Sequence, residues 1–180
     1  MEEIVTDDKE IYGQLKQYLH ENQPEDENRL RLYEDAMLPL AKLYQIDKAM
    51  EEALSTHVWL KSGGYLVIEP TEAMTVIDVN TGKYTGKKNK RDTILKINLE
   101  AAAEISHQMR LRNLSGIILV DFIDMEEKED QELLMKTLAV QCARDPVKTT
   151  VVDMTRLNLV EITRKKIRKP LHEQVRLFGK

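Results

Sequence analysis

Residues 117–124 read IILVDFID, and this stretch is typical of a strand at the centre of a sheet. Four branched apolar residues lead directly into Asp121, two more apolar residues follow, and Asp124 ends the stretch. A charge within a buried strand is unfavourable unless a partner compensates it. The stretch therefore predicts a sheet and raises the question of what stabilises Asp121.

A second stretch repeats the same pattern of apolar run and carboxylate. Met74-Thr-Val-Ile precedes Asp78, and ligands of open α/β sheets bind at the carboxyl ends of strands. If the two strands are neighbours, Asp78 and Asp121 converge, and like charges at close range need a proton or a cation between them. Mg²⁺ prefers oxygen ligands and takes one or two carboxylates with several waters. Asn80 shares the face of Asp78 and offers a neutral oxygen to such an ion.

Other acidic and amide residues have simpler interpretations. Asp124 stands three residues before Glu127, a spacing that predicts a capping box opening the next helix. Asn80-Thr-Gly is also favourable turn chemistry, which leaves two interpretations open for Asn80. Asp153 follows another β-rich run, and we favour a structural role there over a third metal ligand.

Basic residues surround the predicted site in the sequence. The loop that follows the Asp78 strand contains Lys83, Lys87, Lys88 and Arg91, while Arg110 and Arg112 close the next predicted helix. A cationic loop beside a Mg²⁺ site suits a phosphate-rich polymer, although a solvated surface loop explains the same composition. The phosphate-binding motifs GxxxxGK[ST] and GxGxxG are absent from the sequence.

Hydrophobic periodicity predicts an alternation of strands and helices. We expect strands within 2–6, 29–34, 73–80, 117–120 and 149–154, a hairpin over 56–70, and helices over 9–22, 47–54, 92–112, 126–143 and 158–168. This order predicts an α/β fold, in which helices pack on a mixed sheet whose core is largely parallel.

The composition describes an ordinary globular chain of 180 residues with a net charge of −4. Its acidic residues concentrate in the first third, and its basic residues in the remainder. The single cysteine, Cys142, excludes an intrachain disulfide and a cysteine cage for a metal. No apolar run approaches the roughly 20 residues of a membrane span, and the acidic N-terminus lacks signal-peptide features. We therefore expect a cytoplasmic protein without a membrane segment.

Two blocks of the sequence resemble the catalytic region of the ribonuclease E/G family: SGGYLVIEPTEAMTVIDVNTG at 62–82 and INLEAAAEISHQMRLRNLSGIILVDFIDM at 97–125. The resemblance covers about 58–168. It implies a Mg²⁺-dependent endoribonuclease, with Mn²⁺ as an alternative ion, that hydrolyses single-stranded RNA to 5′-phosphate and 3′-hydroxyl ends. Asp78 and Asp121 match the catalytic metal ligands of the family, and Asn80 matches the asparagine that supports them.

The resemblance also implies a division of the chain and several departures. Residues 57–180 resemble a DNase I-like catalytic subdomain, and residues 1–56 resemble part of an RNase H-like subdomain more loosely. The S1 domain, the 5′ sensor and the zinc-linking Cys-Pro-x-Cys element of the family have no counterpart here, so we expect a catalytic fragment without zinc. The formation of a homodimer is left undecided by the sequence. The competing interpretations are a weak RNA-binding or docking module without activity in isolation and a phosphatase of small substrates.

Overall fold

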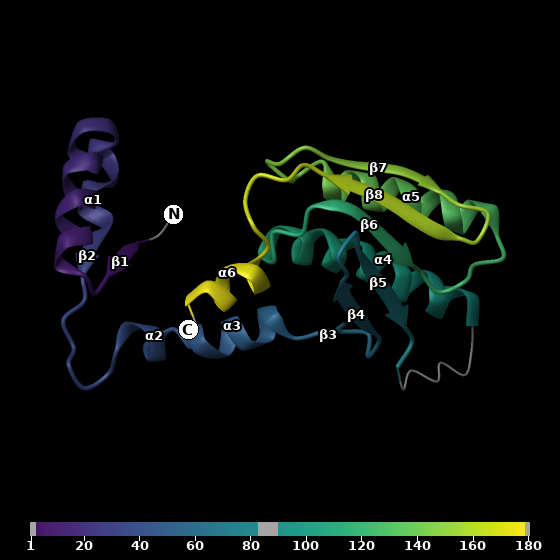
Figure 1. Cartoon of the computed structure of the whole chain (residues 1–180), viewed down its shortest axis with the longest axis horizontal. Coiled ribbons are helices and arrows are strands. Elements are labelled where there is room, and N and C mark those ends of the chain that lie inside the picture. The colour runs from purple at the N-terminus through teal and green to yellow at the C-terminus, as the bar shows by residue number, and fades with distance from the viewer. Residues whose placement is uncertain (1–2, 83–89, 179–180) are drawn as a thin grey trace. The chain divides into compact units, whose positions relative to one another are not determined.

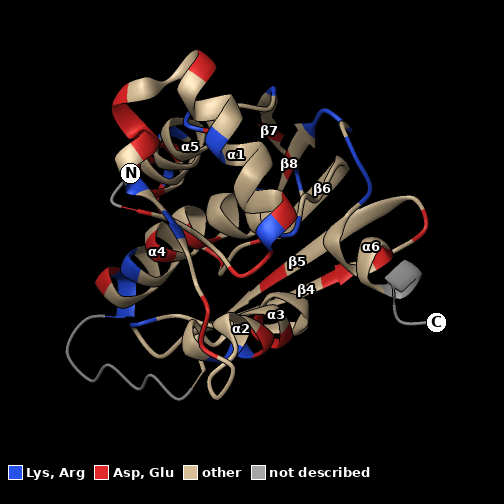
Figure 2. Ribbon diagram, turned by 90° about the vertical axis from the view of Figure 1, so that its left-hand side faces the viewer, with Lys and Arg blue, Asp and Glu red and all other residues tan. Residues whose placement is uncertain are grey.

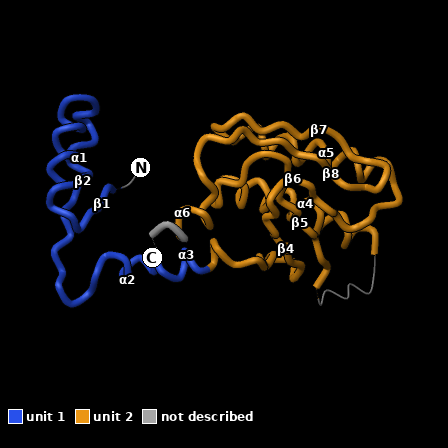
Figure 3. The backbone as a smooth tube through the Cα atoms, in the orientation of Figure 1, with its two compact units in different colours: residues 1–51 blue, residues 52–180 orange. Residues whose placement is uncertain are grey.

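The computed structural model describes residues 3–82 and 90–178. The chain divides into two compact units, Met1–Glu51 and Glu52–Lys180 (Figure 3). We describe each unit by itself. Their correspondence to RNase H-like and DNase I-like subdomains stays a prediction.

The first unit is a small parallel β-pair with a crossover helix. β1 (Ile4–Thr6) pairs with β2 (Leu30–Leu32), and α1 (Lys9–Asn22) and the 3-10 helix η1 (Pro24–Arg29) connect them. The carboxylate of Asp8 caps α1 by accepting from the backbone N–H groups of Glu10 and Ile11, at 2.8 and 3.0 Å. α2 (Leu40–Leu43) follows, and α3 (Ile46–Leu54) leads into the second unit.

The second unit contains a six-stranded sheet in the order β3-β4-β5-β6-β8-β7. Its strands are β3 (His57–Trp59), β4 (Tyr65–Pro70), β5 (Met74–Asn80), β6 (Gly116–Asp121), β7 (Thr149–Met154) and β8 (Leu159–Arg164). β5 and β6 run parallel, and every other neighbouring pair in this sheet is antiparallel. The predicted mixed sheet is therefore confirmed. The expectation of a largely parallel core is wrong, because hairpins rather than crossover helices connect most of the neighbouring strands.

The predicted helix over 158–168 is also wrong, since β8 occupies Leu159–Arg164. Val160 and Ile162 are fully buried, while Thr163 between Ile162 and Arg164 is exposed. This period of two, with β-branched residues in the run, favours a strand over the helix that the following Lys and Arg residues suggested.

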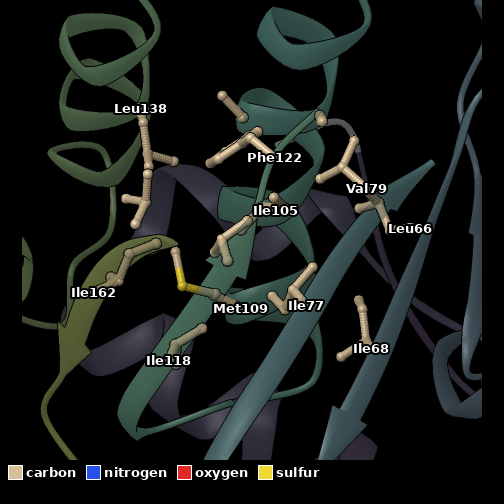
Figure 4. Packing of buried hydrophobic residues seen from close by; sticks show 14 of the residues in the cluster. Leu66, Ile68, Ile77, Val79, Ile105, Met109, Ile118, Phe122, Leu138 and Ile162 are labelled. Atoms are coloured by element: carbon tan, nitrogen blue, oxygen red, sulfur yellow. The ribbon is translucent and has the colours of Figure 1, made fainter. Parts of the chain in front are cut away.

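Two helices cover one face of this sheet. α4 (Lys90–Leu111) connects β5 to β6, and α5 (Lys128–Cys142) connects β6 to β7 (Figure 1). Apolar side chains of both helices meet the sheet in one core (Figure 4), which includes Leu66, Ile77, Ile105, Met109, Ile118, Leu138 and Ile162. A last helix, α6 (Leu171–Phe178), ends the described chain, and no helix in the described residues is long and apolar enough to cross a membrane.

The opposite face of the sheet, here called the open face, has a different composition. Along β6, Ile118 and Val120 point into the core, whereas Ile117 is 48% exposed and Asp121 is exposed. The alternation follows from the pleat of a strand, in which successive side chains point to opposite faces. The IILV run is thus a strand with one buried face, and the open face carries Asp121.

Candidate functional site

Asp78 and Asp121 occupy paired positions on the two parallel strands of the sheet. The register of β5 and β6 places the Cα atoms of these two residues opposite each other. Neighbouring strands lie about 4.8 Å apart, and directly paired residues project to the same face. Both carboxylates therefore project from the open face at the carboxyl ends of their strands. Figure 2 shows the acidic positions of β4 and β5 in red.

Asn80 extends this pair along β5. Its side-chain Nδ2 donates a hydrogen bond of 2.7 Å to Oδ2 of Asp78, which orients both side chains. The side-chain oxygen Oδ1 of Asn80 can then accept from, or bind, another partner. The backbone of Asn80 packs tightly against the β3–β4 hairpin. A Cβ on Gly64 would lie 2.7 Å from the Asn80 carbonyl oxygen, so this approach requires glycine.

The electrostatics of the pair favour a bound cation. Partial burial raises the pKa of Asp121, and the neighbouring carboxylates of Asp78 and Asp124 raise it further. A divalent ion between Asp78 and Asp121 would remove this repulsion. Among the described residues, no group of three His, Cys, Asp or Glu side chains is arranged to hold a metal. Two carboxylates with a neutral oxygen nearby fit Mg²⁺, which keeps several waters, better than a metal that needs a closed cage.

A buried amide holds the backbone that follows Asp121. Asn98 on α4 is fully buried, donates through Nδ2 to the Ile123 carbonyl oxygen at 2.8 Å, and accepts from the Ile123 N–H at 3.1 Å. These two bonds fix the chain just after the β6 carboxylate. Sequence reasoning missed Asn98, although a polar residue on the apolar stripe of a predicted helix is a signal that was available.

The structure corrects the interpretation of Asp124. α5 begins at Lys128 with Glu127 as its N-cap, and no side chain caps this helix start. The Asp124 carboxylate instead accepts a hydrogen bond of 3.1 Å from Nδ2 of Asn158, which lies in the turn between β7 and β8. The capping box is therefore wrong, because the helix begins three residues later than the motif requires.

The predicted RNA-binding cations differ in where they lie. Lys83, Lys87 and Lys88 fall outside the described residues. Arg91 makes a two-bond ion pair with the buried Asp130, with Nε–Oδ2 at 2.7 Å and Nη2–Oδ1 at 3.0 Å. This hydrogen bonding raises the pKa of Arg91 and lowers the pKa of Asp130. The pair borders a cavity of about 310 Å³ that Lys90 and Asp124 also line.

The two arginines at the end of α4 are more enclosed. Arg110 is partly exposed and donates to the Ser106 hydroxyl at 2.8 Å. Arg112 is 7% exposed, donates from Nε to Gln108 at 2.7 Å, and has a lowered pKa because of its burial. Such burial limits the access of an RNA phosphate to this guanidinium, and the predicted RNA contact of Arg112 stays a prediction.

The chain is similar to a family of ribonucleases. The model of the Ribonuclease E/G family matches residues 1–167. Ribonuclease G of Haemophilus influenzae is 43% identical over 171 residues, and Ribonuclease G of Escherichia coli is 40% identical over 171 residues. Each alignment covers 95% of this chain and 35% of the relative. Ribonuclease E of Nostoc sp. is 45% identical over 141 residues, which are 78% of this chain and 20% of that protein.

This chain belongs to the ribonuclease E/G family. It spans about a third of the length of the Ribonuclease G relatives that it matches. The resemblance noted for residues 62–82 and 97–125 is thereby confirmed, and the match extends into the first compact unit.

Proposed function

We propose that this chain carries the catalytic part of an endoribonuclease that hydrolyses single-stranded RNA with a divalent metal ion, Mg²⁺ or Mn²⁺. Asp78 and Asp121 would hold the ion, with Asn80 supporting Asp78. In this proposal the second unit corresponds to the DNase I-like subdomain of the family and the first unit to part of the RNase H-like subdomain. The products would carry 5′-phosphate and 3′-hydroxyl ends.

One observation carries the proposal: two carboxylates from distant segments are paired across the parallel strands β5 and β6. A purely structural carboxylate usually has a cationic or N–H partner, as Asp130 and Asp145 do here. Asp121 instead faces Asp78 and Asp124, and its pKa is raised by partial burial and then by these two carboxylates. Two facing carboxylates without a cationic partner among the described residues are typical of a site that a ligand completes.

The residues of this chain would bind and orient the substrate phosphate. A divalent ion held there would neutralise charge on the phosphate and lower the pKa of the attacking water. Asn80 would keep Asp78 in one rotamer through its 2.7 Å hydrogen bond. Asn98 would keep the chain after Asp121 in place through its two bonds to Ile123. Lys90, at the rim of the cavity beside Asp124, would attract the RNA backbone.

Metal binding provides a test that does not depend on turnover. The 180-residue chain would be titrated with Mn²⁺, and free Mn²⁺ would be measured by electron paramagnetic resonance. We expect Asp121→Asn to weaken Mn²⁺ binding at least tenfold, because it removes one of two carboxylate charges while it preserves shape. Unchanged Mn²⁺ affinity in Asp121→Asn would rule out this metal site.

A matched control uses Asp153→Asn. Asp153 is an exposed aspartate on β7, opposite Glu161 of β8, and is separated from β6 by that strand. We expect the Asp153→Asn variant to bind Mn²⁺ as the unmodified chain does. Equal losses of Mn²⁺ affinity in Asp153→Asn and Asp121→Asn would indicate a general charge effect.

A cleavage assay separates the enzyme from a binding module. The chain spans only about a third of the Ribonuclease G relatives, which favours weak substrate binding as the second candidate. End-labelled single-stranded RNA would be incubated with the chain in Mg²⁺ or in EDTA. Mg²⁺-dependent cleavage that Asp121→Asn abolishes supports the enzyme, and salt-sensitive binding without cleavage supports the module.

A further inference from the structure

Aromatic side chains gather on the open face at β3 and β4, where His57 and Trp59 are exposed and Tyr65 is half-buried. Trp59 is 70% exposed, and its ring centroid lies 5.2 Å from that of Tyr65 in a tilted arrangement. His57 stacks on the other side of this cluster, with its centroid 5.7 Å from Tyr65 and an angle of 29° between the rings. An exposed aromatic group on a sheet is costly to leave in water, so it indicates a binding surface.

The strand register places these rings beside the carboxylate pair. Tyr65 is paired with Trp59 on β3 and with Asn80 on β5, so the three residues form one row across neighbouring strands. In the adjacent row, Asp78 is paired with Asp121. A diagonal neighbour on adjacent strands lies about 7–8 Å away, which is the separation expected between Tyr65 and Asp78. The rings and the carboxylates thus share one end of one face.

The hairpin that carries the rings is held in place by α4. The Glu100 carboxylate on α4 accepts hydrogen bonds from the backbone N–H groups of Lys61 at 2.6 Å and Ser62 at 3.1 Å. On the other side, the turn lies so close to the backbone of Asn80 on β5 that glycine is required at Gly64. A Cβ added to Gly82 would likewise meet the Gly63 carbonyl oxygen. The aromatic rings therefore project from a backbone that is fixed on two sides.

The charge of the open face limits what can bind there. Two further acidic residues lie on this face. Glu161 on β8 is paired with Leu119 on β6, and Asp153 on β7 is paired with Glu161. Away from a divalent ion at the carboxylate pair, this acidic surface repels phosphates, so an RNA strand gains little there from backbone contacts. Planar bases carry no charge and stack on aromatic rings, which makes them the part of an RNA strand that this face accepts.

We propose that Trp59 and Tyr65 form a base-stacking platform for the nucleotides next to the phosphate that lies at Asp78 and Asp121. The inference rests on the proposed function and names the part of the substrate that the open face binds. Stacking on aromatic rings does not depend on base identity, so the platform favours single strands without a strong sequence preference. Bases in a duplex are already stacked and paired, so they are excluded from it.

Trp59 is the single tryptophan of the chain, so its fluorescence reports directly on the platform. The chain would be titrated in EDTA, where no metal-dependent cleavage occurs, with an oligouridylate and with an abasic oligoribonucleotide of equal length and charge. We expect saturable quenching by the oligouridylate and little quenching by the abasic strand. Equal quenching by both strands, or none by either, would overturn the platform.

Substitutions separate a role in stacking from a role in folding. Tyr65→Ala should weaken oligouridylate binding about tenfold in EDTA, whereas Tyr65→Phe, which keeps the ring, should bind as the unmodified chain does. Tyr18→Ala removes an exposed tyrosine of the first unit and serves as the matched control. Unchanged binding in Tyr65→Ala, or an equal loss in Tyr65→Phe, would contradict the proposal.

The outcomes for the platform and for the metal site are distinguishable. Base-dependent quenching with unchanged Mn²⁺ affinity in Asp121→Asn would support the platform and rule out the metal site. Loss of Mn²⁺ binding in that variant, without base-dependent quenching, would support the metal site and rule out the platform. In that case the exposed rings are better explained as a contact for another protein segment.

Discussion

At the scale of single residues, carboxylates in the second unit fall into two groups. The side chains of Asp145 and Arg164 are 2% and 3% exposed, and they form an ion pair with Nε–Oδ2 at 2.7 Å. Arg164 also donates to Oδ1 of Asn113 and to the Leu114 carbonyl oxygen. This pair is fully satisfied and structural. Asp121 is exposed and faces other acids, which is why we assign a ligand to it.

The buried pair leads to a prediction about stability and pH. Burial opposes ionisation of Asp145, but hydrogen bonds from Arg164 and from the Val147 N–H outweigh it and lower the pKa of this carboxyl group. A lowered pKa in the folded state stabilises the fold above the ordinary pKa of about 3.9. That contribution is lost as the pH falls through the lower folded value.

Asp145→Asn should therefore destabilise the second unit most at neutral pH. Leaving the Arg164 charge buried without its partner costs about 3–5 kcal/mol. We expect this loss in urea unfolding at pH 7, together with a smaller decrease in stability between pH 5 and pH 3 than in the unmodified chain. Glu132→Gln, an exposed position on α5, should change stability by less than about 0.5 kcal/mol. A parallel pH dependence in the two chains would contradict this assignment.

At the scale of elements, the β3–β4 hairpin, β5 and α4 form one supporting frame for the site. Glu100 binds the hairpin turn, Asn98 binds the backbone after β6, and both residues belong to α4. The helix between the two parallel strands therefore fixes both neighbours of the carboxylate pair. Side chains on the open face are thus positioned by a helix on the opposite face of the sheet.

Gly64→Ala tests how closely this frame is packed. The new methyl group would meet the Asn80 carbonyl oxygen at 2.7 Å and Cγ2 of Ile97 at 3.1 Å. Overpacking of this kind costs about 1–3 kcal/mol, so we expect lower stability in urea unfolding. Mn²⁺ affinity should also fall, because the backbone of Asn80 must shift.

Gly13→Ala provides the control, because a Cβ at this position in α1 has no atom within 4 Å. Alanine favours a helix interior over glycine by about 0.5–1 kcal/mol, so α1 should gain helicity without any change in Mn²⁺ affinity. If both variants lost Mn²⁺ binding equally, the contact of Gly64 with β5 would not be the cause.

At the scale of the whole molecule, the two compact units differ in how much they bury. Among the described residues of the first unit, Thr6 and Leu19 are the buried ones, whereas the hydrophobic core lies entirely within the second unit. Burial of apolar surface is the main source of stability, so the first unit is expected to open more readily.

Hydrogen exchange measured by mass spectrometry should show this difference directly. We expect amides of α1 to exchange much faster than those of α4 at neutral pH, because α1 buries one side chain and α4 buries eight. Both helices are in the same chain, which controls for solvent conditions, and protection factors correct for the intrinsic rates of the two sequences. Equal protection in α1 and α4 would mean that the first unit has stabilising contacts that its burial does not explain.

Local patterns in the sequence determined several elements well. The 3.6-residue period marked α1, and the Gly63-Gly64 turn between alternating runs marked the β3–β4 hairpin. The apolar runs before Asp78 and Asp121 marked β5 and β6. These features depend on neighbours within a few residues, which is why the sequence alone determines them. The family was recognisable for the same reason, because its motifs are contiguous.

Only the tertiary structure decided which residues meet. The pairing of Asp78 with Asp121, the antiparallel β8 in place of a helix, and the hydrogen bond from Asn158 to Asp124 all join distant segments. Burial likewise separated Arg112, which lies within the fold, from residues that contact solvent. Strand register and burial depend on the packing of α4 and α5 against the whole sheet, and no local window of sequence contains that information.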